Sequence, residues 1–348
     1  MRSHVRTILV LAVALALVVA FLYNVDLRGV ATSIAGARPG WLVLSLVTTF
    51  ANLAIRALRW QYLLAPLGPT RFVNAFRATA VGFAANAVLP ARAGEVIRPY
   101  FLARQAPPEQ HGRMTATGAF ATIILERLLD TVTVLILLAS FVFVFGTELE
   151  RVNPTAFGLV KWAGASAALV AISALVVLFV LAGDPERLGR AMARLERVLP
   201  SKLAGMVAGI AERFARGLGV IRRPGRLIAA LAWSFPLWLS ICVGIWSMTV
   251  AFRFAIPFTG SFLLLALLVL GVAVPTPGAV GGFHEAFRVG ATVFYGAPDA
   301  AAVGAAIVLH AFSIGPSLLL GLLFAAQEGL NFGSMRRLAN QAERGNAA

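Results

Sequence analysis

Six long runs without a charged residue divide this chain. They cover residues 7–25, 41–55, 131–147, 162–183, 227–252 and 300–327. A helix needs about 20 predominantly apolar residues to cross a bilayer, so we expect six full crossings. Only 13% of the residues are charged, whereas soluble domains carry about 25%. The sequence therefore predicts an all-α polytopic membrane protein.

Two further apolar segments are interrupted. The first, residues 72–104, contains the stretch "NAVLPARAGEVIRPYF", and the second, residues 258–296, contains "PTPGAVGGFHEAFR". Proline and glycine break helices, and such breaks in lipid are tolerated where they line a protein cavity. We interpret both segments as broken helical hairpins.

The loops differ in charge. Most of the 30 basic residues fall in the loops that are cytoplasmic if the N-terminus is inside. The positive-inside rule then places both termini in the cytoplasm of a cell that carries this protein in its inner or plasma membrane. Each broken segment must begin and end on one side, so we expect re-entrant hairpins of opposite orientation. If both arms of each hairpin cross the membrane completely, the protein has ten transmembrane helices, and the loops and termini stay on the same sides.

We expect residues 1–330 to form a single membrane domain. Within it, residues 184–226 form a basic segment that we expect to lie on the inner leaflet as an amphipathic helix, and residues 331–348 form a basic cytoplasmic tail. The net charge of +15 is spread over short loops, which argues against a nucleic-acid partner. With one cysteine, Cys242, no cysteine-based metal site is expected, and we predict no cofactor.

The first interrupted stretch carries Asn86, Arg92, Glu95 and Arg98. Glu95 and Arg98 are spaced i, i+3, which places them on one helix face and predicts an ion pair. The planar guanidinium of Arg92 suits a phosphate. The alternative is a solvated cytoplasmic loop.

A second polar group, "ERLLD", contains Glu126, Arg127 and Asp130. Glu126 and Asp130 lie one helical turn apart, and Arg127 can pair with Asp130. A purely structural ion-pair cluster that includes Arg98 or Arg59 remains an alternative. We interpret Arg56 and Arg59 as residues that anchor the cytoplasmic end of the second span.

The second interrupted stretch carries Pro275, Thr276, Pro277, Gly278 and Glu285. A helix that starts at such a break directs backbone N–H groups and a positive dipole end into the cavity, which favours an anion. An ordinary turn on the outer side is the alternative.

The three motifs, in this order, resemble those of the flippase-like integral membrane family, which is related to the transmembrane (flippase) domain of lysylphosphatidylglycerol synthases. The resemblance covers residues 10–326. It implies two re-entrant elements, a central cavity and movement of lipids between leaflets. It assigns pattern positions to Asn86, Pro90, Gly94, Glu95, Arg98, Glu126, Arg127, Asp130, Pro275, Pro277, Gly278 and Glu285. The aminoacyl-lipid synthase domain of the two-domain members does not follow in this sequence, so we do not expect an aminoacylating activity.

Our leading hypothesis is a lipid translocase whose polar cavity carries the headgroup of a phospholipid or polyprenyl-linked lipid. The expected partners are membrane lipids with an anionic or phosphate-containing headgroup. One alternative is an embedded lipid-phosphate transferase or hydrolase that uses Glu95 or Asp130 as base. Another is a non-transporting protein that recruits a cytoplasmic lipid-modifying enzyme. Assembly into a homo-oligomer remains open.

Overall fold

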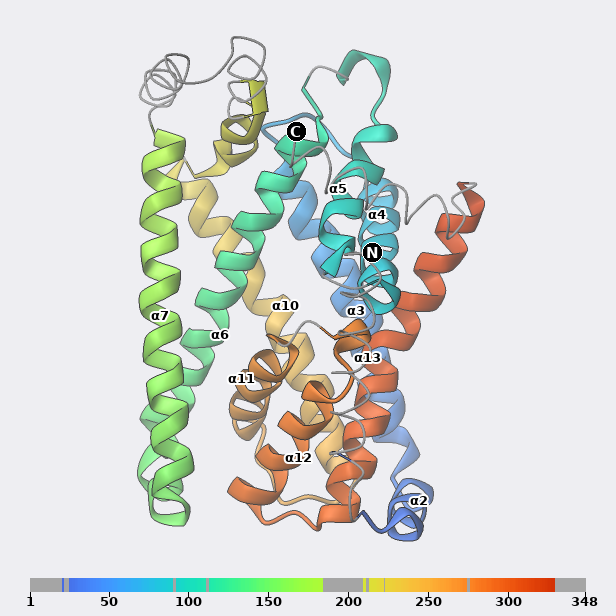
Figure 1. The fold of residues 1–348 in the computed structure, drawn as a ribbon, viewed down its shortest axis with the longest axis vertical. Coiled ribbons are helices and arrows are strands. Elements are labelled where there is room, and N and C mark those ends of the chain that lie inside the picture. The colour runs from blue at the N-terminus through green and yellow to red at the C-terminus, as the bar shows by residue number, and fades with distance from the viewer. Residues whose placement is uncertain are drawn as a thin grey trace, which may run out of the picture.

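The computed structural model describes residues 21, 25–89, 92–110, 113–183, 209–210, 213–221, 223–273 and 276–328, and the regular structure in them is helical (Figure 1). The α-helices are α2 (Leu27–Ala35), α3 (Pro39–Leu64), α4 (Phe72–Val88), α5 (Gly94–Arg104), α6 (Ala116–Val152), α7 (Pro154–Gly183), α10 (Pro224–Ala251), α11 (Gly260–Ala273), α12 (Gly282–Tyr295) and α13 (Asp299–Gln327). Short 3-10 turns are η2 (Pro108–Gln110), η3 (Leu218–Val220) and η4 (Pro277–Ala279). The predicted all-α membrane fold is confirmed.

Five of the described helices are long and apolar enough to cross a membrane. They are α3, α6, α7, α10 and α13, and each runs between the upper and lower ends of the molecule in Figure 1. They match five of the six predicted crossings. The first predicted crossing, residues 7–25, lies almost entirely outside the described residues, as do residues 184–208 of the basic segment and the tail 331–348.

Helices α4 and α5 form one hairpin at the upper end, and α11 and α12 form another at the lower end (Figure 1). Their helices contain 17, 11, 14 and 14 residues. At 1.5 Å per residue the longest of them spans about 25 Å, which is less than the roughly 30 Å of a hydrocarbon core. Both hairpins therefore turn back inside the molecule, as the re-entrant interpretation predicts.

The tips of the two hairpins meet near the middle of the molecule. The Arg92 guanidinium, from the turn before α5, donates a hydrogen bond of 2.7 Å from Nη2 to the carbonyl of Val272 in α11. Gly278 of η4 lies beside Ala87 of α4, so that a Cβ at Gly278 would be 3.5 Å from the Ala87 carbonyl oxygen. Gly278 also has a φ of 62°, a conformation that glycine adopts without steric cost.

Helix α6 extends well upstream of the uncharged run 131–147. Its 37 residues make a rod of about 55 Å. The helix passes without a break through Glu126, Arg127 and Asp130. Glu126 and Asp130 can be buried within the molecule because they pair with side chains of α3 and α5, as described below.

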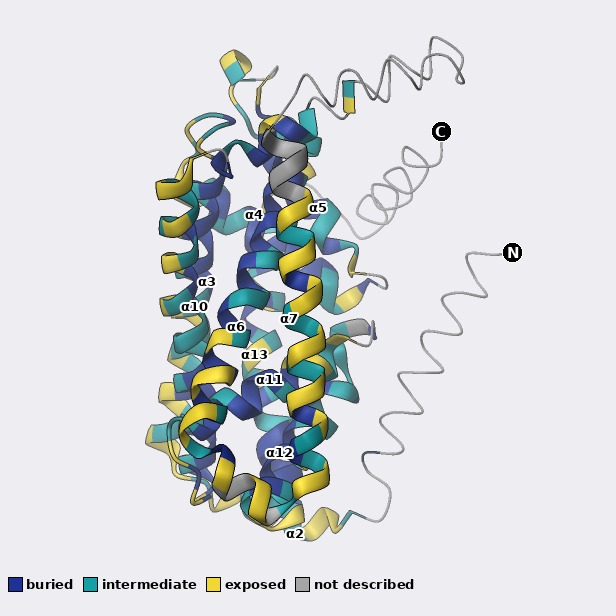
Figure 2. Ribbon diagram, turned by 90° about the vertical axis from the view of Figure 1, so that its left-hand side faces the viewer, coloured by how far each residue is buried: buried dark blue, intermediate teal, exposed yellow. Residues whose placement is uncertain are grey.

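Close helix contacts depend on small and hydroxylated residues. The Ser45 hydroxyl of α3 donates 3.0 Å to the carbonyl of Gly244 in α10. A Cβ added to Gly321 of α13 would collide with the Ala80 carbonyl of α4. Small residues allow helix backbones to approach in a membrane. Figure 2 shows many exposed residues along α7, as expected for a helix that faces lipid.

The hairpin of α4 and α5 depends on Gly94. A Cβ at this position would collide with the Gly82 carbonyl and lie 2.7 Å from the Asn86 side-chain oxygen. Gly94→Ala should therefore lower the free energy of unfolding by about 1–3 kcal/mol through overpacking. The matched control is Gly158→Ala in α7, where a Cβ would meet nothing within 4 Å. An equal decrease in the melting temperature of both variants, measured in detergent, would contradict this prediction.

Candidate functional site

Two arginines of α3 point into the protein. Arg56 and Arg59 are 5% and 0% exposed, and they lie one turn apart on the same helix face. The interpretation of both as anchors at the membrane surface was wrong. The reason is that α6 carries two carboxylates that face them, so the arginines are neutralised by protein groups and not by the interface.

Glu126 and Asp130 of α6 receive the arginines of α3. Arg59 Nη1 lies 2.6 Å from Asp130 Oδ1, and Arg59 Nη2 lies 3.3 Å from Glu126 Oε1. Arg56 makes longer contacts, with its Nη1 at 3.4 Å from Glu126 Oε1 and 3.6 Å from Asp130 Oδ2. Arg59 is therefore the more firmly held of the two guanidinium groups.

The re-entrant helix α5 adds Arg98. Its Nη1 donates 3.1 Å to Glu126 Oε1, and its guanidinium carbon stands 3.8 Å from the centre of the Trp60 ring. The expected Glu95–Arg98 pair does not form, because Arg98 turns to the fully buried Glu126, where the lower effective dielectric strengthens the attraction. Glu95 lies instead 3.9 Å from Arg127 Nε.

Helix α10 completes the surroundings of the acidic residues. The Ser234 hydroxyl accepts a hydrogen bond of 2.7 Å from Arg59, and Trp238 Nε1 donates 2.9 Å to Asp130 Oδ1. Arg127 donates to Glu126 over 2.9 Å and lies 3.7 Å from Asp130, which confirms the predicted i, i+3 contact.

We call Arg56, Arg59, Arg98, Glu126, Arg127 and Asp130 the arginine–carboxylate cluster. Its four arginines face two carboxylates, so positive charge exceeds negative charge by two within the cluster. Several of its polar atoms, among them Arg56 Nε and Asp130 Oδ2, have no hydrogen-bond partner among the described residues. Guanidinium groups bind phosphate and carboxylate well. Among the described residues, no group of three or more His, Cys, Asp or Glu could hold a metal ion.

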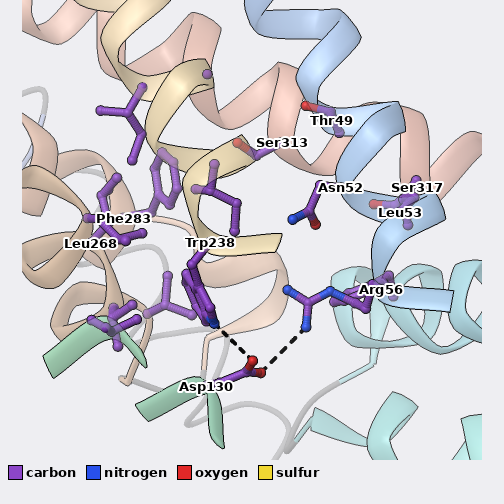
Figure 3. Close-up of a pocket in the computed structure, with 18 of the residues that line it drawn as sticks. Thr49, Asn52, Leu53, Arg56, Asp130, Trp238, Leu268, Phe283, Ser313 and Ser317 are labelled. Atoms are coloured by element: carbon purple, nitrogen blue, oxygen red, sulfur yellow. Dashed lines mark hydrogen bonds and ion pairs between the residues drawn. The ribbon is translucent and has the colours of Figure 1, made fainter. Parts of the chain in front are cut away.

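A cavity of about 610 Å³ adjoins this cluster. Arg56, Arg127 and Asp130 line its charged part, together with Arg92 and Glu95 from the α4–α5 hairpin. Figure 3 shows Arg56 and Trp238 converging on Asp130, with Asn52 and Thr49 of α3 beyond them. Apolar side chains complete the wall, including Leu265, Leu268, Val269 and Val272 of α11 and Phe283 of α12. Ligand sites typically have volumes of about 300–1,000 Å³, with few convergent polar groups.

Asn86 and Arg92, the remaining predicted residues of the first motif, differ in their relation to the cavity. Asn86 does not line the cavity, and its side-chain oxygen accepts a hydrogen bond of 2.8 Å from the Gly94 amide at the start of α5. This contact shapes the turn of the hairpin. Arg92 lies on the cavity wall and bridges to α11.

Thr276, Gly278 and Glu285 of the third motif do not line the cavity. Thr276 donates 3.0 Å to the carbonyl of Val280 within the turn, and Gly278 contacts His310 Nε2 through its carbonyl at 2.7 Å. The Glu285 carboxylate is 47% exposed and lies 3.6 Å from Arg288. The backbone of Pro277 begins η4, whereas Pro275 lies outside the described residues. The cavity thus brings together the first two motifs, with Phe283 as its wall residue from the third.

Sequence reasoning missed the polar face of α3, apart from Arg59 as a possible partner of the acidic residues of α6. Ser45, Thr48, Asn52 and Arg56 all line the cavity, and they recur at spacings of three or four residues. This periodicity marks one face of a helix. This pattern could have been recognised from the sequence, because neutral polar residues within a span usually face the protein interior.

Comparison with known protein families matches a segment of the chain that includes all three motifs. Residues 7–321 match the family described as lysylphosphatidylglycerol synthase TM region. The chain belongs to this family. No curated protein matches the sequence. Membership in the lysylphosphatidylglycerol synthase TM region family agrees with the spans found here and marks the protein as a lipid-related, multi-pass membrane protein.

Removing the buried carboxylate of Glu126 should destabilise the protein far more than removing an exposed carboxylate. Glu126→Gln leaves Arg59, Arg98 and Arg127 without their shared negative charge, and breaking a buried pair costs about 3–5 kcal/mol. The matched control is Glu150→Gln, because Glu150 forms an exposed pair of 3.2 Å with Lys161; such a pair contributes about 0–1 kcal/mol. Thermal unfolding in detergent measures both, and equal losses would refute the structural role of Glu126.

Proposed function

We propose that this protein moves a lipid between the two leaflets of a membrane, with the headgroup in the cavity and the acyl or polyprenyl tails in the bilayer. The obstacle to such movement is the cost of taking a charged headgroup through hydrocarbon, which is at least about 2.5–3.5 kcal/mol for a single charged side chain. A protein lowers this cost by replacing water with fixed polar groups.

The observation that carries the proposal is a charged cavity between two opposed re-entrant hairpins. Arg56 and Arg127 line it from two full-length helices, and Arg92 lines it from the tip of one hairpin. Both hairpins end inside the molecule, where many transporters place their substrate sites. The apolar wall from α11, including Leu268 and Val272, offers a surface beside which a lipid tail can lie.

The excess of positive charge in the cluster favours a lipid with a phosphate group. Arg59 and Arg98 do not line the cavity, and Asp130 and Glu126 hold them over 2.6 Å and 3.1 Å, so we assign them a structural role. Arg56 and Arg127 face the cavity and are the proposed phosphate ligands. Planar guanidinium groups bind phosphate oxygens in pairs, which orients the headgroup.

Lipid transfer in vesicles tests the proposal. Purified protein should speed the movement of a fluorescent anionic phospholipid across liposome membranes, and Arg56→Gln should reduce this rate at least about tenfold, since the loss of a hydrogen bond to a charged group costs about 1.5–3 kcal/mol. The matched control is Arg77→Gln, which removes an arginine outside the cavity that lies 3.6 Å from Glu328. Equal rates for wild-type vesicles, Arg56→Gln vesicles and protein-free vesicles would disprove a translocase.

We further propose that the end with the α4–α5 hairpin faces the cytoplasm, as the distribution of basic residues suggests. The chain has a single cysteine, Cys242, which is fully buried, so an introduced cysteine can report its side. An impermeant maleimide added outside intact cells should label Arg38→Cys, at the start of α3, and spare Arg104→Cys, at the end of α5. The wild-type protein serves as the unlabelled control. The reverse labelling pattern would overturn this orientation.

A further inference from the structure

Two histidines form a contact that the proposed translocation site does not use. His284 lies in the first turn of α12, His310 lies near the middle of α13, and their ring centres are 4.3 Å apart. Both side chains are half-buried, and neither lines the cavity. Phe283, which does line it, has its ring centre 5.2 Å from that of His310. Because histidine ordinarily changes charge between about pH 5 and 8, the pair is a candidate site for a proton.

Both imidazoles are hydrogen-bonded to the turn between α11 and α12. His310 Nε2 lies 2.7 Å from the carbonyl oxygen of Gly278, and the amide of Gly281 donates to Nδ1 of His284 over 3.3 Å. A carbonyl oxygen only accepts, so Nε2 of His310 carries a hydrogen, whereas Nδ1 of His284 accepts and carries none. A neutral imidazole has one N–H and one acceptor nitrogen. The two contacts therefore fix the neutral form of each ring, with the hydrogen on Nε2 in both.

The two rings differ in the effect of an added proton. On His310 the proton binds the lone pair of Nδ1, and the bond from Nε2 to Gly278 remains and becomes charge-assisted. On His284 the proton binds Nδ1, which removes the acceptor of the Gly281 amide and sets two donors against each other. His310 is therefore the ring that takes the proton.

The spacing of the rings limits the pair to one proton. Two imidazolium charges on rings with centres 4.3 Å apart repel each other strongly in surroundings less polar than water. Once His310 is charged, His284 stays neutral and keeps its bond with Gly281.

In the described part of the chain, no charged side chain forms a hydrogen bond or ion pair with either imidazole. Glu285 contacts Arg288 at 3.6 Å, and Arg288 contacts Asp299 at 2.6 Å. Helix α11 and the turn η4 contain no charged or titratable residue. The remaining charged or titratable residues of α12 and of the helices packed against α12 or α13 are Arg28, Arg56, Arg59, Tyr62, Arg77, Arg226, Cys242 and Tyr295. Proton binding by the pair therefore depends on the two rings and their backbone partners.

The backbone partner of His310 lies where the two hairpins meet. A Cβ at Gly278 would be 3.5 Å from the carbonyl oxygen of Ala87 in α4, and the same turn leads into Phe283 on the cavity wall. Helix α13, which carries His310, is long enough to cross the membrane. A stronger bond from His310 to Gly278 thus holds the second hairpin more firmly on a full-length helix.

We propose that the His284–His310 pair binds one proton, at Nδ1 of His310, and that this proton fastens the second hairpin to α13 and slows lipid movement. The proton comes from the surrounding water, and no backbone hydrogen bond breaks when it binds. The effect on lipid movement rests on the proposed translocase, whereas proton binding itself does not.

Nitrogen NMR of histidine-labelled protein in detergent tests proton binding. The chain has four histidines, so the loss of a signal in a variant assigns it. His310→Gln keeps a donor near the position of Nε2, and His284→Asn keeps an acceptor near the position of Nδ1, so both variants retain the bonds to the turn. Between about pH 8 and pH 5, His310 should gain a proton at Nδ1 in the wild type and in His284→Asn, while His284 stays neutral. A His310 ring that stays neutral over this range, or two rings that both become charged, would overturn the proposal.

Lipid movement in vesicles at two pH values tests the effect on the hairpin. The wild type should move a fluorescent anionic phospholipid about tenfold more slowly near pH 5 than near pH 8, because a hydrogen bond to a charged group is stronger than a neutral one by about this factor. His310→Gln should show no pH response, and the matched control His284→Asn should keep that of the wild type. Protein-free vesicles give the background at each pH. An equal response in the wild type and His310→Gln, or faster movement near pH 5, would refute the role of the pair.

The two measurements separate this inference from the proposed translocase. A protein whose His310 takes up a proton but that moves no lipid at either pH would refute the translocase and support the proton site. A protein that moves lipid at the same rate at both pH values would support the translocase and refute the effect of the proton.

Discussion

The buried ion pairs of Glu126 and Asp130 are the interaction on which the rest of the structure depends. Removing charges from water costs several kcal/mol per ion, and lipid offers no other compensation, so arginines from α3 and α5 and the indole of Trp238 must all reach α6. This requirement holds a short re-entrant helix against two full-length helices. It also leaves an excess of positive charge beside the cavity, where Arg56 and Arg127 lie on the wall.

The opposed hairpins provide the space in which this charge acts. A helix that stops inside the membrane exposes polar backbone, which is stable only where protein surrounds it. Here the hairpin tips cover one another, and Arg92 donates to the end of α11 through the carbonyl of Val272. The cavity lies between these tips and the long helices. Its lining has guanidinium groups in one part and hydroxyl and apolar side chains in another.

Much of the fold was predictable because helix-spanning segments follow from local composition. The apolar runs and the breaks at proline and glycine predicted the five spans of the described residues and both hairpins. Family resemblance rested on the same motifs. The partners of the charges were less predictable: contacts of the second motif with Arg98 or Arg59 were expected only as an alternative, and the Glu95–Arg98 pair that was expected from spacing does not form, because Arg98 pairs with Glu126. Spacing rules describe neighbours on one helix and contain no information on contacts between helices.

The sequence by itself determined that this chain spans a membrane, where its helices are interrupted and which segments carry charge, because each of these properties depends on consecutive residues. Only the tertiary structure decided which charges are structural and which face a cavity. Arg56 and Arg59 have similar local sequence, yet Arg59 is fully enclosed by Asp130, Glu126 and Ser234, while Arg56 lines the cavity. The physical reason is that residues of α6 and α10, which are distant from α3 in the chain, surround Arg59, and spacing within one helix does not describe such contacts.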